Sequence, residues 1–280
     1  MIGIHNFDKP TIGIAGFGFV GQAVYASIKT ECNVVVYDKY KPKFSNIKNI
    51  GGSITILVCL PTPMDLETGS QNISELHEFL SQLADIKYEG IVIIKSTVFF
   101  ENIVKWSFKL NLVLNPEFLN QNSAPDDFAN QNMVLLGGSA SHTCEVRKIY
   151  KTCFNLPEDT NYQLVSATEA CHFKYMHNIY HAYQVLFWNY VQQKTGNSRK
   201  YVMLYEMLYG RKPILNQIAL DGQLGYGGAC FPKDVNAMQF ESPHLLTEFM
   251  CRFNAELRPN VEAANGPVNI ECSKKKITQY

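Results

Sequence analysis

A glycine-rich segment around one cysteine contains the residue types that covalent catalysis needs. Residues 225–234 read Gly-Tyr-Gly-Gly-Ala-Cys-Phe-Pro-Lys-Asp, so Cys230 follows a run of glycines and precedes Pro232 and Asp234. Glycines let backbone N–H groups converge on a ligand, and the residues after the cysteine predict a helix start. A cysteine at a helix start is a better nucleophile because its thiolate is stabilised there. Most cysteines are small buried hydrophobes, so the segment alone leaves a nucleophile and a buried thiol open.

A second glycine pattern, near the start of the chain, predicts a dinucleotide-binding loop. Gly16, Gly18 and Gly21 have the spacing G-x-G-x-x-G directly after an apolar, strand-like run. The first glycine permits the tight turn, the second lets the backbone approach a pyrophosphate, and the third lets the next helix pack closely. Asp38 ends the following strand-like run. A carboxylate there accepts hydrogen bonds from ribose hydroxyls and repels a 2′-phosphate, which favours NAD over NADP. The alternative is a glycine turn with Asp38 as a solvated loop charge.

The elements that must position these residues alternate in type over the first half of the chain. Strands are predicted at residues 11–15, 33–37, 54–60, 91–95, 110–114 and 133–136. Helices are predicted at residues 20–29, 73–85, 101–109 and 141–154. Most of the strand runs are apolar throughout, as expected for parallel strands that are covered on both faces. This α/β alternation predicts a doubly wound parallel sheet, the Rossmann arrangement.

Beyond a last strand-like run at residues 163–166, the pattern becomes helical. Residues 168–193 contain no proline or glycine and carry a broad apolar stripe, which predicts one helix about 39 Å long. Shorter helices are predicted at residues 198–209, 234–239 and 244–257. We therefore expect an NAD-binding domain at residues 1–162, an all-helical dimerisation and catalytic domain at residues 163–258, and a disordered tail at residues 259–280.

Composition excludes several classes of protein. The 25 Lys and Arg residues balance 25 Asp and Glu residues, so no overall field attracts nucleic acid or an anionic membrane. The eight cysteines are scattered, and no two are separated by two residues. We therefore expect reduced thiols of a cytoplasmic protein, and neither a disulfide framework nor a metal site. No run of about 18 apolar residues is long enough to cross a membrane, and the N-terminal residues lack the pattern of a signal peptide.

Six motifs in a fixed order make the chain resemble the UDP-glucose/GDP-mannose dehydrogenase family. Each motif alone is weak, but their joint order over most of the chain is specific. They are the glycine loop with Asp38, Leu-Pro-Thr-Pro at 60–63, Lys-Ser-Thr-Val at 95–98, Asn-Pro-Glu-Phe-Leu at 115–119, Lys174 with Asn178, and the segment 225–234. The resemblance implies a two-step, four-electron oxidation of the C6 alcohol of a nucleotide sugar to a carboxylate, with UDP-glucose as the default substrate and NAD as cofactor.

The resemblance also implies a role for each catalytic residue. Cys230 would capture the aldehyde as a thiohemiacetal and then carry the thioester. Lys174 and Asn178 lie four residues apart and so share one helix face, where they would stabilise the alkoxide and the tetrahedral oxyanions. Glu117 would be the base for thioester hydrolysis. Asp234 and Thr97 would position or deprotonate a water molecule near the reacting carbon.

The binding residues follow from the same motifs. The residues expected to bind the cofactor are Gly16, Gly18, Phe19, Val20, Gly21, Asp38, Pro61, Thr62 and Thr97. Those expected to bind the nucleotide sugar are Phe118, Leu119, Lys174, Asn178, Tyr226, Gly227 and Gly228. In this family the long helix lies at a dimer interface, so we expect a homodimer through residues 168–193. The aromatic residues of this helix are otherwise expected to be buried within its own domain.

Three departures from the family pattern concern the substrate. About 45 residues follow Asp234, too few for the second Rossmann-like domain that normally closes over the nucleotide. Ile214 and residues 219–221 replace an arginine and an aromatic-Leu-Lys element, although Arg211 and Lys212 lie nearby. Gln121 stands where a second carboxylate often follows Glu117.

Two alternatives to this function remain open. One is a short β-hydroxyacid dehydrogenase, which has a similar length and uses a helix lysine but no cysteine. The other is a catalytically inactive NAD-binding partner protein.

Overall fold

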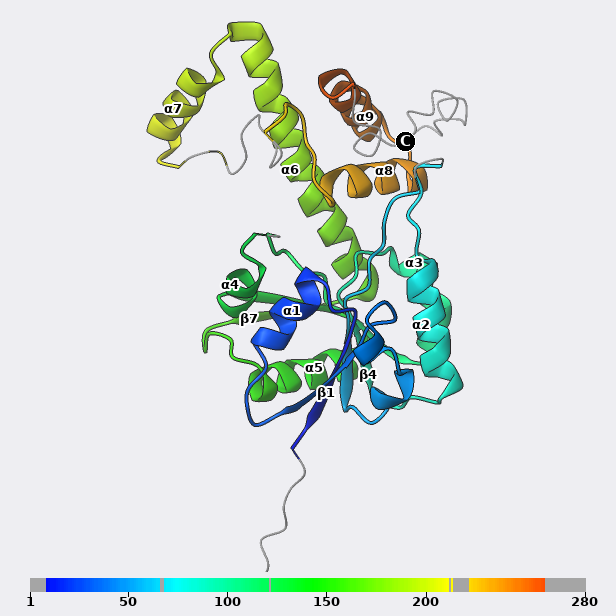
Figure 1. Ribbon diagram of the computed structural model, residues 1–280. Coiled ribbons are helices and arrows are strands. Elements are labelled where there is room, and N and C mark those ends of the chain that lie inside the picture. The colour runs from blue at the N-terminus through cyan, green and yellow to red at the C-terminus, as the bar shows by residue number, and fades with distance from the viewer. Residues whose placement is uncertain (1–8, 66–67, 121, 212, 214–221, 260–280) are drawn as a thin grey trace, which may run out of the picture. The chain divides into compact units, whose positions relative to one another are not determined.

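The computed structural model describes residues 9–65, 68–120, 122–211, 213 and 222–259 (Figure 1). The chain divides into two compact units. The first comprises Met1–Thr62 and Ile73–Lys174, and the second comprises Pro63–Asn72 and Tyr175–Tyr280. The domain boundaries expected at residues 162 and 258 stay predictions, and the expected tail at residues 259–280 lies outside the described residues except for its first residue.

The first unit is built on a seven-stranded sheet with the order β2-β1-β3-β4-β5-β6-β7. Its strands are β1 (Thr11–Ala15), β2 (Asn33–Tyr37), β3 (Thr55–Val58), β4 (Ile91–Ile94), β5 (Asn111–Leu114), β6 (Met133–Gly137) and β7 (Asn161–Val165). The first five are parallel. β6 pairs antiparallel with β5 through the single pair Leu114 and Gly137, and β7 runs parallel to β6. The predicted α/β fold is confirmed, with the last two strands reversed relative to the other five.

Helices cover both faces of this sheet (Figure 1). One face packs against α1 (Phe19–Ala26), α4 (Ala124–Ala129) and α5 (Ala140–Cys153). The other packs against α2 (Ser74–Asp85) and α3 (Phe100–Ile103). All four residues of β3 and of β4 are buried, because each strand lies between two helical layers. This burial explains why their sequences are apolar throughout.

Three segments of the first unit differ from expectation. The helix predicted at residues 101–109 is instead the short α3 followed by the 3-10 turn Val104–Phe108, because β-branched and aromatic residues favour the helix weakly. α4 was not predicted, since six residues are too few to show a helical period, although Pro125 and two aspartates occupy its first turn. Two 3-10 turns, Pro42–Phe44 and Ile47–Asn49, connect β2 to β3.

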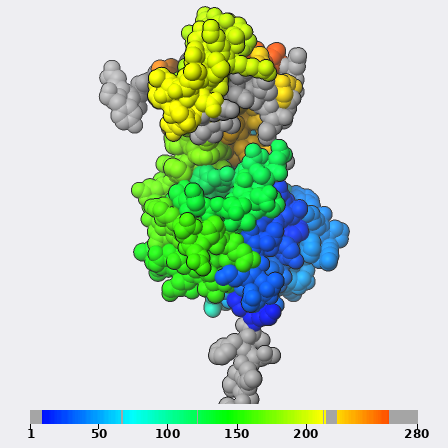
Figure 2. Space-filling model, turned by 90° about the vertical axis from the view of Figure 1, so that its left-hand side faces the viewer, coloured from blue at the N-terminus to red at the C-terminus, as the bar shows by residue number. Residues whose placement is uncertain are grey.

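In the second unit, most of the described residues from residue 175 onward are helical. α6 (Ala167–Thr195) begins in the first unit and continues into the second, and it is followed by α7 (Ser198–Tyr209), α8 (Phe231–Glu241) and α9 (Leu245–Leu257). α7 ends at Gly210, whose φ of +67° is the left-handed conformation that terminates many helices. Figure 2 shows α7 in yellow at the surface, where Met207 and Leu208 are each 74% exposed. α8 begins three residues earlier than predicted, which makes Cys230 its N-cap.

Candidate functional site

The glycine loop between β1 and α1 has a backbone that two of its glycines require. Gly16 has φ +87°, and a Cβ on it would lie 2.7 Å from the carbonyl oxygen of Cys59. A Cβ on Gly21 would lie 2.1 Å from the carbonyl oxygen of Gly16. A Cβ on Gly18 would meet no atom within 4 Å, so packing within the chain gives no reason for a glycine there. Close approach of a ligand would explain the glycine. Gly18 is the N-cap of α1, and Phe19 and Val20 form the first turn of this helix, where a phosphate group can bind.

Asp38, directly after β2, ties that strand end to the glycine loop. Its Oδ2 accepts a hydrogen bond from the backbone N–H of Phe17 at 3.0 Å, and its Oδ1 accepts one from Tyr40 at 3.0 Å. The ammonium of Lys41 lies 3.8 Å from Oδ2. Because a carboxylate has about four acceptor positions, these contacts leave capacity for ribose hydroxyls. The residues present therefore fit the adenosine end of NAD.

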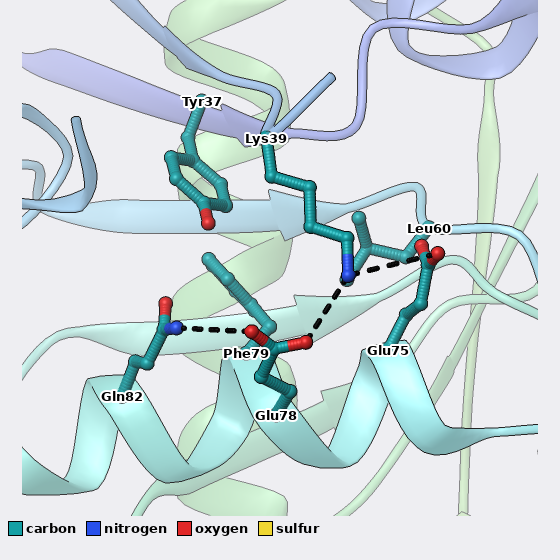
Figure 3. A pocket seen from close by; sticks show the side chains of 7 residues that line it. All are labelled: Tyr37, Lys39, Leu60, Glu75, Glu78, Phe79 and Gln82. Atoms are coloured by element: carbon teal, nitrogen blue, oxygen red, sulfur yellow. Dashed lines mark hydrogen bonds and ion pairs between the residues drawn. The ribbon is translucent and has the colours of Figure 1, made fainter. Parts of the chain in front are cut away.

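A small pocket next to this strand end contains an internal ion-pair cluster (Figure 3). Lys39 points between two carboxylates of α2, with Nζ 3.7 Å from Glu75 Oε1 and 3.1 Å from Glu78 Oε2. The hydrogen bond with Glu78 raises the pKa of Lys39. The rings of Tyr37 and Phe79 stack with their centroids 5.4 Å apart. Two carboxylates facing one ammonium make this pocket unfavourable for a phosphate group.

The motifs after β3 and β4 lie at the carboxyl ends of neighbouring parallel strands. Thr62 donates its hydroxyl to the carbonyl oxygen of Thr97 at 2.8 Å, and Ser96 donates to the carbonyl oxygen of Leu60 at 2.7 Å. Pro61 is exposed. β1 has β2 on one side and β3 on the other, so the chain reverses its winding direction there. Ligands of open α/β sheets bind at such carboxyl ends.

Glu117 and Lys174 form a buried ion pair in the first unit. Lys174 Nζ donates to the carbonyl oxygen of Glu117 at 2.6 Å and lies 3.4 Å from its Oε1. The other carboxylate oxygen accepts the backbone N–H of Leu119 at 2.6 Å. Lys174 Nζ also lies 5.3 Å from the centre of the Phe118 ring. The structure therefore brings together two residues for which the sequence predicted separate roles.

A second buried cation in the same unit was not predicted as a site residue. Lys95 is 3% exposed and donates to the side-chain oxygen of Asn115 at 3.0 Å. The hydroxyl of Tyr150 bonds to the same oxygen, and the amide of Asn115 donates to the carbonyl oxygen of Leu135 at 2.9 Å. Burial lowers the pKa of Lys95 to about 8. The sequence signal that could have identified Lys95 was its position at the end of an apolar, strand-like run.

In the second unit, Asn178 and Asp234 form a buried hydrogen-bonded pair close in sequence to Cys230. Asn178 donates from Nδ2 to Asp234 Oδ2 at 2.5 Å, and Lys233 pairs with the other carboxylate oxygen. Asp234 is fully buried, and its backbone N–H donates to the carbonyl oxygen of Cys230 at 2.9 Å. Cys230 itself is partly exposed at the N-terminus of α8. The positive end of the helix favours the thiolate form of such a cysteine.

The glycine-rich segment is held by residues that were not predicted. The backbone N–H of Tyr226 donates to Asn254 Oδ1 at 2.8 Å, and that of Gly225 donates to Asn189 Oδ1 at 3.3 Å. Arg258, 2% exposed, donates to the carbonyl oxygen of Leu224 at 2.7 Å. These buried amides and guanidinium fix the backbone that precedes Cys230. They carry no local sequence signal, because their partners lie 28 to 36 residues away.

The three residues predicted to bind substrate from this segment differ in exposure. The Tyr226 side chain is 1% exposed, and burial raises its pKa well above the usual value. Gly227 lies against the Arg258 guanidinium, since a Cβ there would be 2.3 Å from one of its nitrogens. Gly228 is exposed, with φ +76°. Their roles in substrate binding stay predictions.

The remaining expectations concern residues outside the described part of the chain, a metal site and membrane-spanning helices. Lys212, Ile214, residues 219–221 and Gln121 lie outside the described residues. Within the described part of the chain, no group of three or more His, Cys, Asp or Glu residues could hold a metal ion. No helix among the same residues is both long and apolar enough to cross a membrane.

Two family models match consecutive parts of the chain. Residues 43–154 match the NAD binding domain of the UDP-glucose/GDP-mannose dehydrogenase family, and residues 168–252 match its central domain. Together the two matches span most of the chain. The glycine loop and Asp38 precede the first match.

Individual relatives and solved structures agree with these matches. A UDP-glucose 6-dehydrogenase from Rickettsia felis is 26% identical over 207 residues, which cover 70% of this chain and 46% of that protein. The chain thus spans about half the length of the curated relatives it matches. A UDP-glucose dehydrogenase structure from Pyrobaculum islandicum has a TM-score of 0.73 at 18% identity, covering 91% of this chain and 70% of the other. A 3-hydroxyisobutyrate dehydrogenase from Mycobacterium tuberculosis has a TM-score of 0.67 at 15% identity, covering 96% and 100%. These two structures share the fold.

Proposed function

Because this chain belongs to the UDP-glucose/GDP-mannose dehydrogenase family, we propose that it is a dehydrogenase that oxidises a nucleotide sugar. The match to the NAD binding domain of the family confirms NAD as the cofactor. The observation that carries the proposed reaction is the arrangement in the second unit. Cys230 is the N-cap of α8, and a fully buried carboxylate, Asp234, lies one helical turn later with Asn178 bonded to it. Without the helix start and these two neighbouring side chains, Cys230 would be an ordinary cysteine.

The proposed reaction converts the primary alcohol at C6 of the sugar to a carboxylate. When bound, NAD would supply the hydride acceptor for two successive oxidations, so one sugar would reduce two equivalents. After the first oxidation, the Cys230 thiolate forms a C–S bond to the aldehyde carbon and gives a thiohemiacetal. The second oxidation leaves a thioester on Cys230. Water then attacks the thioester carbon, the C–S bond breaks, and the carboxylate leaves as the thiolate is restored.

Asn178 and Lys174 are proposed to stabilise the negative oxygen that develops in these steps. They lie four residues apart on α6 and so share one face of the helix. Lys174 supplies an ammonium that is already desolvated, and Asn178 supplies an amide whose orientation Asp234 fixes. Preorganised donors in a water-poor site stabilise charge more strongly than solvated ones.

Glu117, Thr97 and Asp234 are proposed to act on water. Glu117 is a buried carboxylate anchored by Lys174 and by the backbone of Leu119, so its position is fixed. Thr97 follows β4 at the carboxyl end of the sheet. Asp234 accepts a hydrogen bond from Asn178 and pairs with Lys233. A carboxylate within reach of a water molecule can deprotonate it as it attacks the thioester.

The substrate we propose is a UDP-hexose, with UDP-glucose as the first candidate. This choice is supported by the names of the relatives, such as the UDP-glucose 6-dehydrogenase from Rickettsia felis. Phe118, Leu119, Gly227 and Gly228 are the proposed contacts to it, together with Tyr226. Because Tyr226 is buried, we propose that it contributes through its backbone rather than its phenol.

A second candidate is a short 3-hydroxyacid dehydrogenase. It is supported by the 3-hydroxyisobutyrate dehydrogenase structure, whose whole length this chain covers. Such an enzyme needs a helix lysine, which Lys174 could supply, but no cysteine. The two candidates therefore differ in whether Cys230 is required and in how many equivalents of NAD one substrate reduces.

The test is a substrate panel with NAD, followed by NADH absorbance. We expect NADH from UDP-glucose or another nucleotide sugar, with two equivalents per sugar consumed. Cys230→Ser should stop acid formation after the first oxidation, whereas Cys144→Ser, which changes a partly exposed cysteine on α5, should behave as wild type. NADH from 3-hydroxyisobutyrate, undiminished by Cys230→Ser, would identify the second candidate. No NADH from any member of the panel would favour a non-catalytic NAD-binding partner protein.

We also propose that the chain forms a homodimer through α6. Six large apolar side chains on this helix are spaced alternately by three and four residues, and each is at least 40% exposed. They are Phe173, Met176, Tyr180, Tyr183, Phe187 and Tyr190. This exposure counts against their burial within their own unit, and the spacing is that of a helix that packs along another helix. Size exclusion with light scattering should give the mass of a dimer, and Tyr183→Glu with Phe187→Glu should give a monomer. A monomeric wild-type chain would contradict the proposal.

A further inference from the structure

Two cysteines of the first unit lie in contact on the face of the sheet that α5 covers. Cys32, in the turn before β2, is partly exposed, and Cys153, the last residue of α5, is 2% exposed. The two thiols are hydrogen-bonded to each other, and both pack in the hydrophobic cluster on this face. The proposed reaction assigns neither residue a role.

The backbone around both cysteines is fixed by a short antiparallel pairing. Ile28 forms a bridge with Phe154, and the backbone N–H of Lys29 donates to the carbonyl oxygen of Cys153 at 2.8 Å. The backbone N–H of Cys32 donates to the carbonyl oxygen of Lys29 at 3.1 Å, so one turn brings Cys32 back toward the residue that faces Cys153. Facing residues of antiparallel segments have Cα atoms about 4.5–5.5 Å apart, and disulfides join Cα atoms about 4.4–6.8 Å apart. Together with the contact between the thiols, this pairing indicates that a disulfide needs little backbone movement.

We propose that Cys32 and Cys153 are a redox-active dithiol that closes to a disulfide when the chain meets a small disulfide oxidant of the glutathione type. Each cysteine that the structure describes is a free thiol, so the structure shows the reduced form of the pair. The composition predicts reduced thiols as the ordinary state, and the proposed disulfide is the state that an oxidant produces.

The oxidation consists of two exchange steps. First, the thiolate of Cys32, the more exposed of the two residues, attacks one sulfur of glutathione disulfide, and one glutathione thiolate leaves. The Cys153 thiolate then attacks the Cys32 sulfur of this mixed disulfide, and the second glutathione thiolate leaves. The two cysteines lose two electrons and two protons in total. One glutathione disulfide is reduced, and the two protons pass through solvent to its two thiolates.

The surroundings of Cys153 make the second exchange the slower one. Burial raises the pKa of the Cys153 thiol to about 12, the hydrogen bond with Cys32 raises this pKa further, and the charge of Lys29 lowers it. Lys29 Nζ donates to the carbonyl oxygen of Lys151 at 3.0 Å, which holds the cation beside the end of α5. Because the thiolate is the nucleophile in exchange, we expect the mixed disulfide at Cys32 to form before the pair closes.

The disulfide would link the start of β2 to the end of α5. The two cysteines are about 120 residues apart in sequence, so the link closes a long loop of the unfolded chain. Restricting the unfolded chain in this way favours the folded state. We therefore expect oxidation to raise the melting temperature of the protein by several degrees.

The test is incubation of the folded chain with glutathione disulfide, alkylation of the remaining thiols, and peptide mass spectrometry without reduction. We expect a linked pair of peptides that contain Cys32 and Cys153, and we expect dithiothreitol to separate them. Cys32→Ser and Cys153→Ser should each abolish both the link and the rise in melting temperature. Cys144→Ser is the matched control, because it removes another thiol from α5, and it should behave as wild type, as should Cys230→Ser. Cys153→Ala replaces the serine variant if far-UV circular dichroism shows that the latter does not fold.

Three results would overturn the proposal. A wild-type chain that keeps both thiols free, or that stops at a glutathione adduct on Cys32, would show that the contact does not close to a disulfide. A link that is lost in Cys144→Ser or in Cys230→Ser would show that another thiol forms the bond. A linked chain that melts at the temperature of the reduced chain would contradict the stabilising effect. The experiment needs neither NAD nor a sugar, so its result is independent of whether the proposed dehydrogenase activity is found.

Discussion

Lys174 and Glu117, 57 residues apart in sequence, are joined twice in the first unit: the ammonium donates to the backbone carbonyl oxygen at 2.6 Å and lies 3.4 Å from Oε1. The side chains are only 5% and 9% exposed. A buried ion pair contributes little net stability by itself, but removing one partner leaves an uncompensated charge. The pair therefore fixes the positions of two residues proposed for catalysis, and it makes each depend on the other.

Removal of the lysine should destabilise the protein strongly. Lys174→Met leaves the Glu117 carboxylate buried with one backbone donor, and we expect unfolding free energy to fall by about 3–5 kcal/mol. Glu117→Gln should cost less, because the ammonium keeps the backbone carbonyl oxygen as a partner. Urea unfolding of both variants measures these changes.

The control for this prediction is an ion pair of the same type in solvent. Lys148 and Glu145 are 3.2 Å apart on α5 with side chains 72% and 52% exposed. Lys148→Met should change the unfolding free energy by less than about 1 kcal/mol. If Lys174→Met lowers the unfolding free energy by no more than Lys148→Met does, the prediction that loss of the buried partner is strongly destabilising is wrong.

Substitutions at two glycines of the dinucleotide loop should affect NAD binding and protein stability separately. Gly18→Ala places a methyl group where no atom lies within 4 Å, so the melting temperature should change little while NAD affinity falls at least tenfold. Gly21→Ala places its methyl group 2.1 Å from the carbonyl oxygen of Gly16, so it should lower the melting temperature by several degrees. Differential scanning fluorimetry and NAD titration measure the two quantities. Equal NAD affinity for wild type and Gly18→Ala would contradict a pyrophosphate site there.

Sequence patterns predicted those parts of the fold whose determinants are local. β1 and β2 have the predicted bounds, because each is a short apolar run that ends at a glycine or a carboxylate. α7 and the end of α9 also agree, since helix ends are marked by caps and by Gly210. The Gly16 turn was predictable because only glycine tolerates its φ and its contact with Cys59.

Features that depend on distant partners could not be predicted in the same way. The reversed direction of β6 rests on one residue pair with β5, which leaves no trace in the local pattern. The bonds of Lys95 to Asn115, and of Arg258 to Leu224, join residues 20 and 34 positions apart. In the sequence, Lys95 and Arg258 cannot be distinguished from ordinary charged residues, because their partners come close only in the folded chain.

Asp38 should determine the choice between NAD and NADP. Asp38→Asn keeps an oxygen that can accept from Phe17, but it removes the charge that repels a 2′-phosphate and leaves Lys41 without its carboxylate partner. We expect NAD affinity to fall about tenfold or more, which corresponds to the loss of a hydrogen bond to a charged group, while NADP affinity rises. Fluorescence titration with both cofactors measures this. Glu31→Gln, an exposed carboxylate in the turn before β2, should change neither affinity, and an unchanged NAD to NADP ratio in Asp38→Asn would refute the role.

The buried Lys95 should make stability depend on pH in a narrow alkaline window. Burial lowers its pKa from 10.5 to about 8, whereas the unfolded chain keeps the ordinary value. Between these two values the unfolded state binds more protons than the folded state, so stability rises with pH. The cost of charging the buried amine is fully present below pH 8 and is lost as the pH rises toward 10.5. From pH 7 to pH 9 the gain should be about 1 kcal/mol.

Buried cysteines oppose this gain in stability at the upper end of the pH range. Burial raises the pKa of Cys59 to about 12 and that of Cys251 to about 11, from 9.0. Because their folded forms retain protons that the unfolded chain releases, these thiols lower stability above about pH 9. The measurement is therefore the difference in unfolding free energy between wild type and Lys95→Met at pH 7, 8 and 9. This difference cancels the thiol contribution, and it should shift in favour of wild type by about 1 kcal/mol over that range. A constant difference would mean that Lys95 does not lose its proton in the folded protein, and the Asn115 oxygen would then be bonded to a charged ammonium throughout.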